Sequence, residues 1–333
     1  MVFWRNLLCG GGDCAIICDM EKKSLAILAA VAAQASACIA WDASTPQPNK
    51  YELPPASPAV VKEAKAAKAR LRRITPSMIM AHRGESEYCP ENTVPAFAAA
   101  VAGGFGFECD LWLSNDGVIF ITHDVWIGAK KGHAARGWAT NMVWHGSLEK
   151  SDVGSWKAPE WEGTRMPTID DVLPWAGDGH LVELHVCDSR SDLILPKLKE
   201  ALARHPNATP KNVRVNVSWF AVDKLRKILP GYRTGGGMLL RSGWLVTDKP
   251  LNVKAIVEKV GPVGLVDVWG PRWDEELVTP EAVAIAHRRG LKVCVWTVND
   301  AASAWAALGR GVDVIMTDRP SSLLREMKEF PVR

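Results

Sequence analysis

Residues 78–113 read MIMAHRGESEYCPENTVPAFAAAVAGGFGFECDLWL. Two short apolar runs in this stretch, Met78–Ala81 and Phe107–Leu113, have the composition of β-strands. The segment between them, Pro95–Ala102, has helical periodicity. Short apolar strands separated by a helix are typical of a parallel sheet that is buried on both faces. The stretch therefore predicts one β-α-β unit.

The same alternation continues toward the C-terminus. Further strand candidates are Val118–Thr122, Leu181–Val186, Val213–Val217, Met238–Leu240, Leu265–Val268, Lys292–Thr297 and Val314–Met316. Helix candidates among them are Leu193–Arg204, Val222–Leu229, Pro280–Arg289 and Ala301–Leu308. About eight such units in residues 77–333 predict an α/β fold of the (β/α)8 TIM-barrel type. A doubly wound sheet is the alternative, because periodicity alone does not separate the two folds.

Residues 124–168 fit no β-α unit. They hold five of the 15 tryptophans of the chain, namely Trp126, Trp138, Trp144, Trp156 and Trp161. We interpret this segment as a Trp-rich insertion over the C-terminal mouth of the barrel. Its tryptophans would form either a small core of their own or an apolar wall for a substrate.

The composition is that of a globular protein. The chain has 333 residues, of which 47% are hydrophobic and 23% charged, and its formal net charge is only +3. It is too apolar for a disordered chain and too polar for a protein that spans a membrane many times. The charge balance gives no reason to expect a nucleic-acid partner.

The first forty residues predict export. Lys22 and Lys23 precede an apolar run, Leu25–Ala40, that ends in small residues, as in a secretory signal that starts at Met20. Cleavage before Cys38 would make this cysteine a candidate for lipid attachment. The alternative is an alanine-rich anchor or a helix of the fold. We expect no stable transmembrane segment after processing and a periplasmic, secreted or lipid-anchored protein.

Residues 41–76 are expected to form a proline-rich linker and a basic helix, Val60–Arg73. This helix would be a solvated surface helix or would contact a membrane surface. The four cysteines of the body are expected to be buried free thiols rather than a disulfide framework. They are Cys89, Cys109, Cys187 and Cys294.

Acidic residues on two strand candidates predict a cation site. Glu108 and Asp110 are two positions apart in one strand and therefore point to the same face. Two carboxylates on one buried face repel each other unless a cation joins them. Glu183 repeats the pattern on another strand, with His185 on its face. Three carboxylates that converge at a barrel mouth would suit a divalent cation, Mg²⁺ or Ca²⁺.

Histidines at strand ends predict acid–base chemistry. His82 and His123 each follow an apolar strand, and barrel active sites are built at the C-terminal ends of the strands. Histidine titrates near neutral pH, so two of them beside a cation form a plausible acid–base pair. Arg83 would offer a planar guanidinium to a phosphate or a carboxylate. Asn92 or Thr93 would cap the helix that starts near Val94.

These residues occur in an order that resembles the glycerophosphodiester phosphodiesterase family. The opening motifs are His82-Arg83-Gly84, Pro90-Glu91-Asn92-Thr93, Glu108-x-Asp110, Asp116-Gly117 and His123-Asp124. Later landmarks are Met166–Leu173, Ser218-x-Phe220, Trp296–Asn299 and Thr317–Pro320. The resemblance covers roughly residues 78–327, nearly the whole body of the chain.

The resemblance implies a TIM barrel that hydrolyses glycerophosphodiesters, which are deacylated phospholipids, to glycerol 3-phosphate and an alcohol. It implies that His82 and His123 are the acid–base pair. It implies a divalent metal held by Glu108, Asp110 and Glu183. It also implies substrate-binding roles, which fall on Arg83, Glu91, His185 and Trp296.

One position departs from the family pattern. Where the family usually has Glu-x-Lys, this chain has Glu183-Leu184-His185, so a permanent cation is missing there. Two alternatives stay open. One is a phospholipase that resembles sphingomyelinase D, although such enzymes are not expected to keep Pro90–Thr93. The other is a catalytically weak barrel that binds a lipid or a glycan.

Overall fold

The structure is a computed structural model. It describes residues 56–71, 73–124, 126–127, 138–139, 143–176, 180–218, 221–236, 268–273 and 278–332. The expected signal, Cys38, most of the proline-rich linker and the strand candidate Met238–Leu240 lie outside the described residues, as does most of Leu265–Val268.

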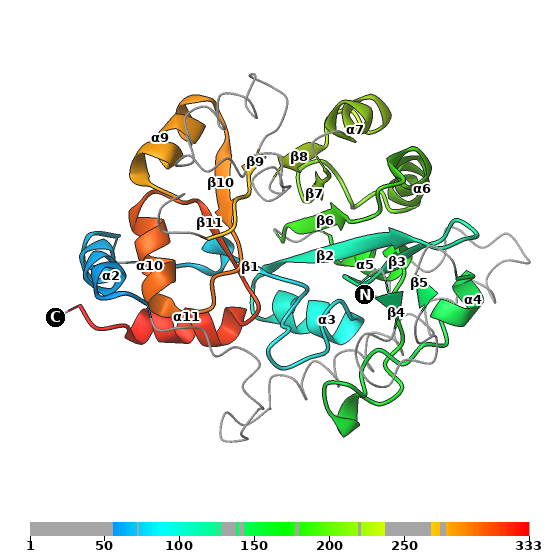
Figure 1. Cartoon of the computed structure of the whole chain (residues 1–333), viewed down its shortest axis with the longest axis horizontal. Helices are drawn as coiled ribbons and strands as arrows, with labels where there is room; N and C mark the ends of the chain where they lie inside the picture. Colours follow the sequence, from blue (N-terminus) through cyan, green and yellow to red (C-terminus); the bar gives the residue numbers. More distant parts are fainter. Residues whose placement is uncertain are drawn as a thin grey trace, which may run out of the picture.

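Eight parallel strands form a barrel (Figure 1). They are β1 (Ile79–Ala81), β2 (Gly106–Leu113), β6 (Val182–Val186), β7 (Val213–Asn216), β8 (Arg233–Gly236), β9 (Val268–Trp269), β10 (Lys292–Val295) and β11 (Val314–Thr317). Each pairs in parallel with its neighbour, and the pairing of β1 with both β2 and β11 joins the two ends of the sheet. The predicted TIM barrel is therefore confirmed over the doubly wound sheet.

Helices surround the barrel (Figure 1). They are α3 (Val94–Ala102), α5 (Ile169–Val172), α6 (Ser191–Arg204), α7 (Val222–Ile228), α9 (Pro280–Arg288), α10 (Ala301–Gly309) and α11 (Pro320–Glu329). Short 3₁₀ turns are η1 (Pro76–Met78), η3 (Pro159–Trp161) and η4 (Leu173–Trp175). Side-chain caps fix two of the starts: Thr279 accepts a hydrogen bond from the backbone of Ala282, and Asp300 from that of Ser303.

The two faces of β2 show how the barrel wall separates apolar from acidic side chains. Phe107, Cys109 and Leu111 belong to the main hydrophobic core, and Phe107 stacks on Phe97 of α3 with ring centroids 4.5 Å apart. Glu108 and Asp110 alternate with them along the strand and line the site pocket. The period of two in the strand therefore places apolar groups toward the helices and carboxylates toward the barrel interior.

The segment after β2 leaves the barrel. β3 (Ile119–Ile121) pairs antiparallel with β2, and β4 (Trp126–Ile127) pairs with β5 (Trp138–Ala139) in a separate two-stranded sheet, followed by α4 (His145–Leu148). In the described part, a small apolar cluster supports this region. It consists of Phe120, Leu148, Val153 and Met166. The Trp-rich insertion as a wall over the mouth stays a prediction.

Helix α2 (Pro58–Leu71) packs beside α10 and α11 (Figure 1). Its buried face contains Val60, Ala64 and Ala67. Lys68 donates from Nζ to three backbone carbonyls at the end of α11, those of Met327, Lys328 and Phe330. The basic helix is thus solvated on one side only, because its alanine stripe is part of the fold.

Three of the four body cysteines are free, namely Cys109, Cys187 and Cys294. Cys89 is disulfide-bonded, so the expectation of a free thiol at Cys89 was wrong. None of the described helices combines the length and the apolar character needed to cross a membrane.

Candidate active site

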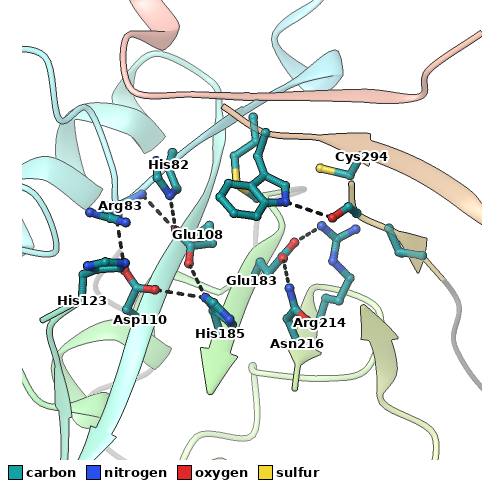
Figure 2. A pocket seen from close by; sticks show the side chains of 14 residues that line it. His82, Arg83, Glu108, Asp110, His123, Glu183, His185, Arg214, Asn216 and Cys294 are labelled. Atoms are coloured by element: carbon teal, nitrogen blue, oxygen red, sulfur yellow. Dashed lines mark hydrogen bonds and ion pairs between the residues drawn. The ribbon is translucent and has the colours of Figure 1, made fainter. Parts of the chain in front are cut away.

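A pocket opens inside the barrel, where β2, β6, β7, β9, β10, β11 and the turn that follows β1 contribute side chains (Figure 2). Its polar lining consists of His82, Arg83, Glu108, Asp110, His123, Glu183, His185, Arg214 and Asn216. Its apolar lining includes Trp296 and Met316. Eight of the nine predicted site residues lie on it, and the ninth, Glu91, contacts Arg83 through an ion pair of 3.1 Å.

Glu108 and Asp110 form the acidic floor of the pocket, and both are almost fully buried. Burial, with the charge of Asp110, raises the pKa of Glu108 well above its usual range. Burial alone would also raise the pKa of Asp110, but the hydrogen bond with His185 and the charge of Arg83 outweigh it and lower that pKa. One carboxyl therefore tends to keep its proton while the other is ionised, as expected where two carboxylates share a site.

His185 stands beside this pair because β2 and β6 are in register, with Glu108 opposite Glu183 and Asp110 opposite His185. His185 Nδ1 lies 3.1 Å from Asp110 Oδ1 and 3.7 Å from Glu108 Oε1. Cys187 follows on the same strand face and lies 3.2 Å from the same Asp110 oxygen. The sequence analysis missed Cys187, although its spacing of two from His185 could have shown it.

Glu183 lies on the other side of the pocket, where its carboxylate is ion-paired with Arg214 of β7 (Figure 2). Asn216 Nδ2 also donates to Glu183 Oε1 at 3.3 Å. Arg214 is only 5% exposed, so the ion pair with Glu183 offsets the cost of burying its charge. Arg214 and Asn216 were missed. Their signal was the alternation Val213-Arg214-Val215-Asn216-Val217, which points both polar groups into the barrel.

His82 follows β1 and is held by an acidic residue after β11. Its Nδ1 lies 2.6 Å from Asp318 Oδ1, and Asn299 Nδ2 donates to the other Asp318 oxygen at 2.7 Å. Burial would raise the pKa of Asp318, but the contact with His82 outweighs it and lowers that pKa. The ionised Asp318 therefore favours the tautomer in which Nδ1 carries the proton and Nε2 faces Glu108, 4.0 Å away.

Arg83 and Asn92 brace the carboxylates from the loop between β1 and α3. Both adopt positive φ, 60° and 57°, which is rare for residues other than glycine. The backbone nitrogen of Arg83 donates to Glu108 Oε2, and its Nε lies 3.1 Å from Asp110 Oδ2. Asn92 exchanges two hydrogen bonds with Asp110. Asn92 is therefore a brace of the site, and Thr93 is the residue at the N-cap of α3.

His123 lies at the end of β3 at the rim of the pocket. Its side chain is 45% exposed, and its Nδ1 lies 2.9 Å from Asp124 Oδ1. Trp296 lies across the pocket, where Nε1 donates to the Gly270 carbonyl and the ring centroid is 6.5 Å from that of His82. His82 and His123 thus differ in exposure: His82 is mostly buried and held by Asp318, whereas His123 is open to solvent.

The donor set at Glu108 and Asp110 fits a divalent cation, because two buried carboxyl groups on one pocket offer the oxygen ligands that such a cation prefers. In the described part of the chain, the group of His, Cys, Asp and Glu ligand atoms that lie within 4.8 Å of one another is Asp110, His185 and Cys187. Glu183 is not in this group, and its carboxylate faces Arg214. Its part in a metal site stays a prediction.

A TIM barrel with carboxylates, histidines and guanidinium groups gathered at one pocket is the arrangement expected of an enzyme active site. The chain belongs to the glycerophosphoryl diester phosphodiesterase family, whose model matches residues 82–322. The resemblance noted in the sequence is thereby confirmed.

Named relatives agree with this assignment. A glycerophosphodiester phosphodiesterase of Caldanaerobacter subterraneus is 26% identical over 259 residues, which cover 76% of this chain and 98% of the relative. One of Bacillus subtilis is 25% identical and covers 80% of this chain and 91% of the relative.

Solved structures share the fold. An Oleispira antarctica phosphodiesterase in complex with the product sn-glycerol-3-phosphate has a TM-score of 0.59 at 23% identity, over 75% of this chain and 96% of that one. A glycerophosphodiester phosphodiesterase of Thermotoga maritima has a TM-score of 0.58 at 19% identity, over 76% and 99%.

Proposed function

We propose that this protein hydrolyses glycerophosphodiesters to glycerol 3-phosphate and an alcohol in a metal-dependent reaction. The observation that carries the proposal is the meeting of His82, Glu108 and Asp110 in one buried pocket of a chain that belongs to this family. The product complex of the Oleispira antarctica neighbour supports glycerol 3-phosphate as the product class.

The two histidines divide the proton transfers. One removes the proton from the attacking oxygen while the P–O bond to the alcohol breaks. The other gives a proton to the departing alkoxide, so that protons balance over the cycle. Attack by water gives glycerol 3-phosphate directly, whereas attack by a glycerol hydroxyl gives a cyclic phosphate that a water then opens. The Asp318 contact holds His82 in a fixed orientation and tautomer, whereas His123 at the rim is placed to exchange protons with solvent.

Charged groups around the pocket suit a phosphodiester. Glu108 and Asp110 would hold the divalent cation, Mg²⁺ or Ca²⁺, with Glu183 as the further predicted ligand. When bound, the cation supplies charge neutralisation for the phosphate and acidifies a coordinated oxygen. Arg83 is fixed by Glu91 and Asp110, and it presents its guanidinium to the same pocket.

The decisive assay measures glycerol 3-phosphate released from glycerophosphocholine, glycerophosphoethanolamine and glycerophosphoglycerol. It is run with and without a chelator, and after Mg²⁺ or Ca²⁺ is added back. Choline phosphate esters such as sphingomyelin serve as control substrates. Release of glycerol 3-phosphate that the chelator abolishes and a cation restores supports the proposal. Hydrolysis of sphingomyelin alone, or no hydrolysis, contradicts it.

We further propose that the protein is exported and that Cys38 is a candidate for lipid attachment. The support is the sequence pattern alone, a short apolar run after Lys22 and Lys23 that ends in Ala35-Ser36-Ala37. Cell fractionation and N-terminal sequencing of the mature protein test export, and incorporation of a labelled fatty acid tests the anchor. An unprocessed chain in the cytoplasmic fraction contradicts both.

A further inference from the structure

Three side chains at the pocket bring an oxygen, a nitrogen and a sulfur atom close together. The acid–base mechanism gives these three atoms no joint role. Asp110 Oδ1, His185 Nδ1 and Cys187 Sγ lie 3.1, 3.2 and 3.6 Å from one another. Asp110 and His185 are register partners on β2 and β6, and Cys187 continues the same face of the chain. Two members of the triangle therefore lie on neighbouring strands, and the third directly follows β6, where its backbone nitrogen still donates to the Leu111 carbonyl of β2.

The size of this triangle matches a small transition-metal ion. Zinc binds carboxylate oxygen and imidazole nitrogen at about 2.0–2.2 Å and thiolate sulfur at about 2.3 Å, so tetrahedral ligand atoms lie roughly 3.4–3.6 Å apart. The observed separations of 3.1–3.6 Å approach these values. Little movement of the three side chains would be needed to close around such an ion.

The chemistry of the three donors points the same way. Mg²⁺ and Ca²⁺ prefer oxygen donors, whereas thiolate and imidazole together favour zinc and similar ions. The carboxylate that would complete an all-oxygen set, Glu183, is ion-paired with Arg214 in this structure. Glu108 Oε1 lies 3.7 Å from His185 Nδ1 and is within reach as a fourth ligand.

We propose that Asp110, His185 and Cys187 form a binding site for a thiophilic divalent cation of the zinc type, which this pocket prefers to Mg²⁺ and Ca²⁺. The site overlaps the one in the proposed function, because both use Asp110. It rests on the proposed function for a metal-dependent reaction in this pocket, but it assigns a zinc-type ion there instead of Mg²⁺ or Ca²⁺, and it does not depend on which ester is hydrolysed.

The test uses cobalt as a spectroscopic substitute for zinc. The full chain, stripped with a chelator, is titrated with Co²⁺ in excess Mg²⁺, and absorption from thiolate-to-cobalt charge transfer is recorded. A second stripped sample is incubated with zinc in excess Mg²⁺, and its bound zinc is counted by elemental analysis after dialysis. We expect one equivalent that Mg²⁺ does not displace, together with a charge-transfer band. Cys187→Ser should lose the band and weaken zinc binding by roughly 100-fold or more, since even partners of metal ligands cost about 10–100-fold.

Two control variants assign the sulfur. Cys109→Ala removes a buried free thiol on the opposite face of β2, so the band and the zinc affinity should stay as in the parent. Cys294 also lines the pocket, and Cys294→Ser should likewise keep the band. A band that survives Cys187→Ser, or that disappears only with Cys294→Ser, overturns the proposal. If the parent chain itself shows no charge-transfer band, the proposal is overturned, and this outcome does not depend on whether any variant folds.

Failure here and failure of the proposed function give different results. If glycerol 3-phosphate release is supported fully by Mg²⁺ or Ca²⁺ while no thiolate band forms, the zinc-type site is overturned and the hydrolysis stands. If zinc binds through Cys187 and no glycerophosphodiester is cleaved with any cation, the metal site stands and the proposed function falls.

Discussion

Glu183 and Arg214 face each other across the β6–β7 ladder, and their side chains form a buried ion pair inside the barrel. The pair places a permanent positive charge one strand away from His185, the position at which the family resemblance led us to expect lysine. A cation is thus kept in the pocket although the lysine is absent. The pair also engages the carboxylate of Glu183, which the sequence analysis predicted to be a metal ligand.

The native structure should depend on the buried ion pair between Glu183 and Arg214. Arg214→Met would leave Glu183 buried without its partner, and we expect a loss of about 3–5 kcal/mol in the free energy of unfolding. Denaturant unfolding measures it. The matched control is Arg204→Ala, which breaks the exposed pair with Asp170 and should cost no more than about 1 kcal/mol. Equal stability of Arg214→Met and the parent would mean that Glu183 takes up a proton or reaches water.

His82→Ala and His123→Ala should each lower turnover by roughly 10²–10⁴ if the two residues do the acid–base work. Folding should be little affected, because both lie at the mouth and not in the packed layers of the barrel. Initial rates of glycerol 3-phosphate release give turnover, and thermal unfolding checks the fold. His287→Ala is the control, because this exposed histidine of α9 pairs with Asp313 and does not line the pocket. Near-normal turnover of either variant would remove that histidine from the mechanism.

Asp318→Asn should act through His82. The amide nitrogen of the introduced asparagine would donate to His82 Nδ1 and favour the other tautomer, so that Nε2 carries the proton at rest. We expect kcat to fall by at least about tenfold, up to the roughly 10⁴-fold known for the analogous change in serine proteases, with KM little changed. Combining Asp318→Asn with His82→Ala should add almost no further loss. Independent, multiplicative losses would show that Asp318 acts by another route.

Glu85 should make stability fall as the pH rises. Burial raises its pKa from 4.5 to about 7, so the folded chain holds a proton there that the unfolded chain releases above pH 4.5. The folded state is therefore favoured at low pH. As the pH rises from about 4.5 to 7, ionisation of this residue alone lowers the free energy of unfolding by up to about 3 kcal/mol. Glu85→Gln should remove that slope and raise stability at pH 8. Parallel stability–pH curves for parent and variant would show that Glu85 ionises freely.

Much of the barrel and part of the site could be predicted from local pattern. The rule that residues two apart in a strand share a face placed Glu108 with Asp110 and Glu183 with His185, and the structure has them so. The family motifs located His82 and His123 at strand ends. These inferences needed only the residue types and their spacing along the chain.

What the sequence could not supply was long-range pairing. Asp318 reaches His82 across 236 positions, and Arg214 reaches Glu183 only through the register of two strands. Asn92 looked like a helix cap because its position before α3 is the local clue, whereas its contact with Asp110 depends on how the loop folds back on β2. Cys89 likewise gave no local sign of its disulfide.

The packing of α2 against α10 and α11 bears on how the chain is made. Lys68 binds carbonyls about 260 positions later, contacts of nearly the longest range available here. During synthesis α2 emerges before the barrel strands, whereas α10 and α11 emerge only after β10. The alanine stripe around Ala64 and Ala67 therefore stays uncovered until almost the whole barrel has been translated. Docking of α2 is for this reason expected to be a late step in the folding of the chain.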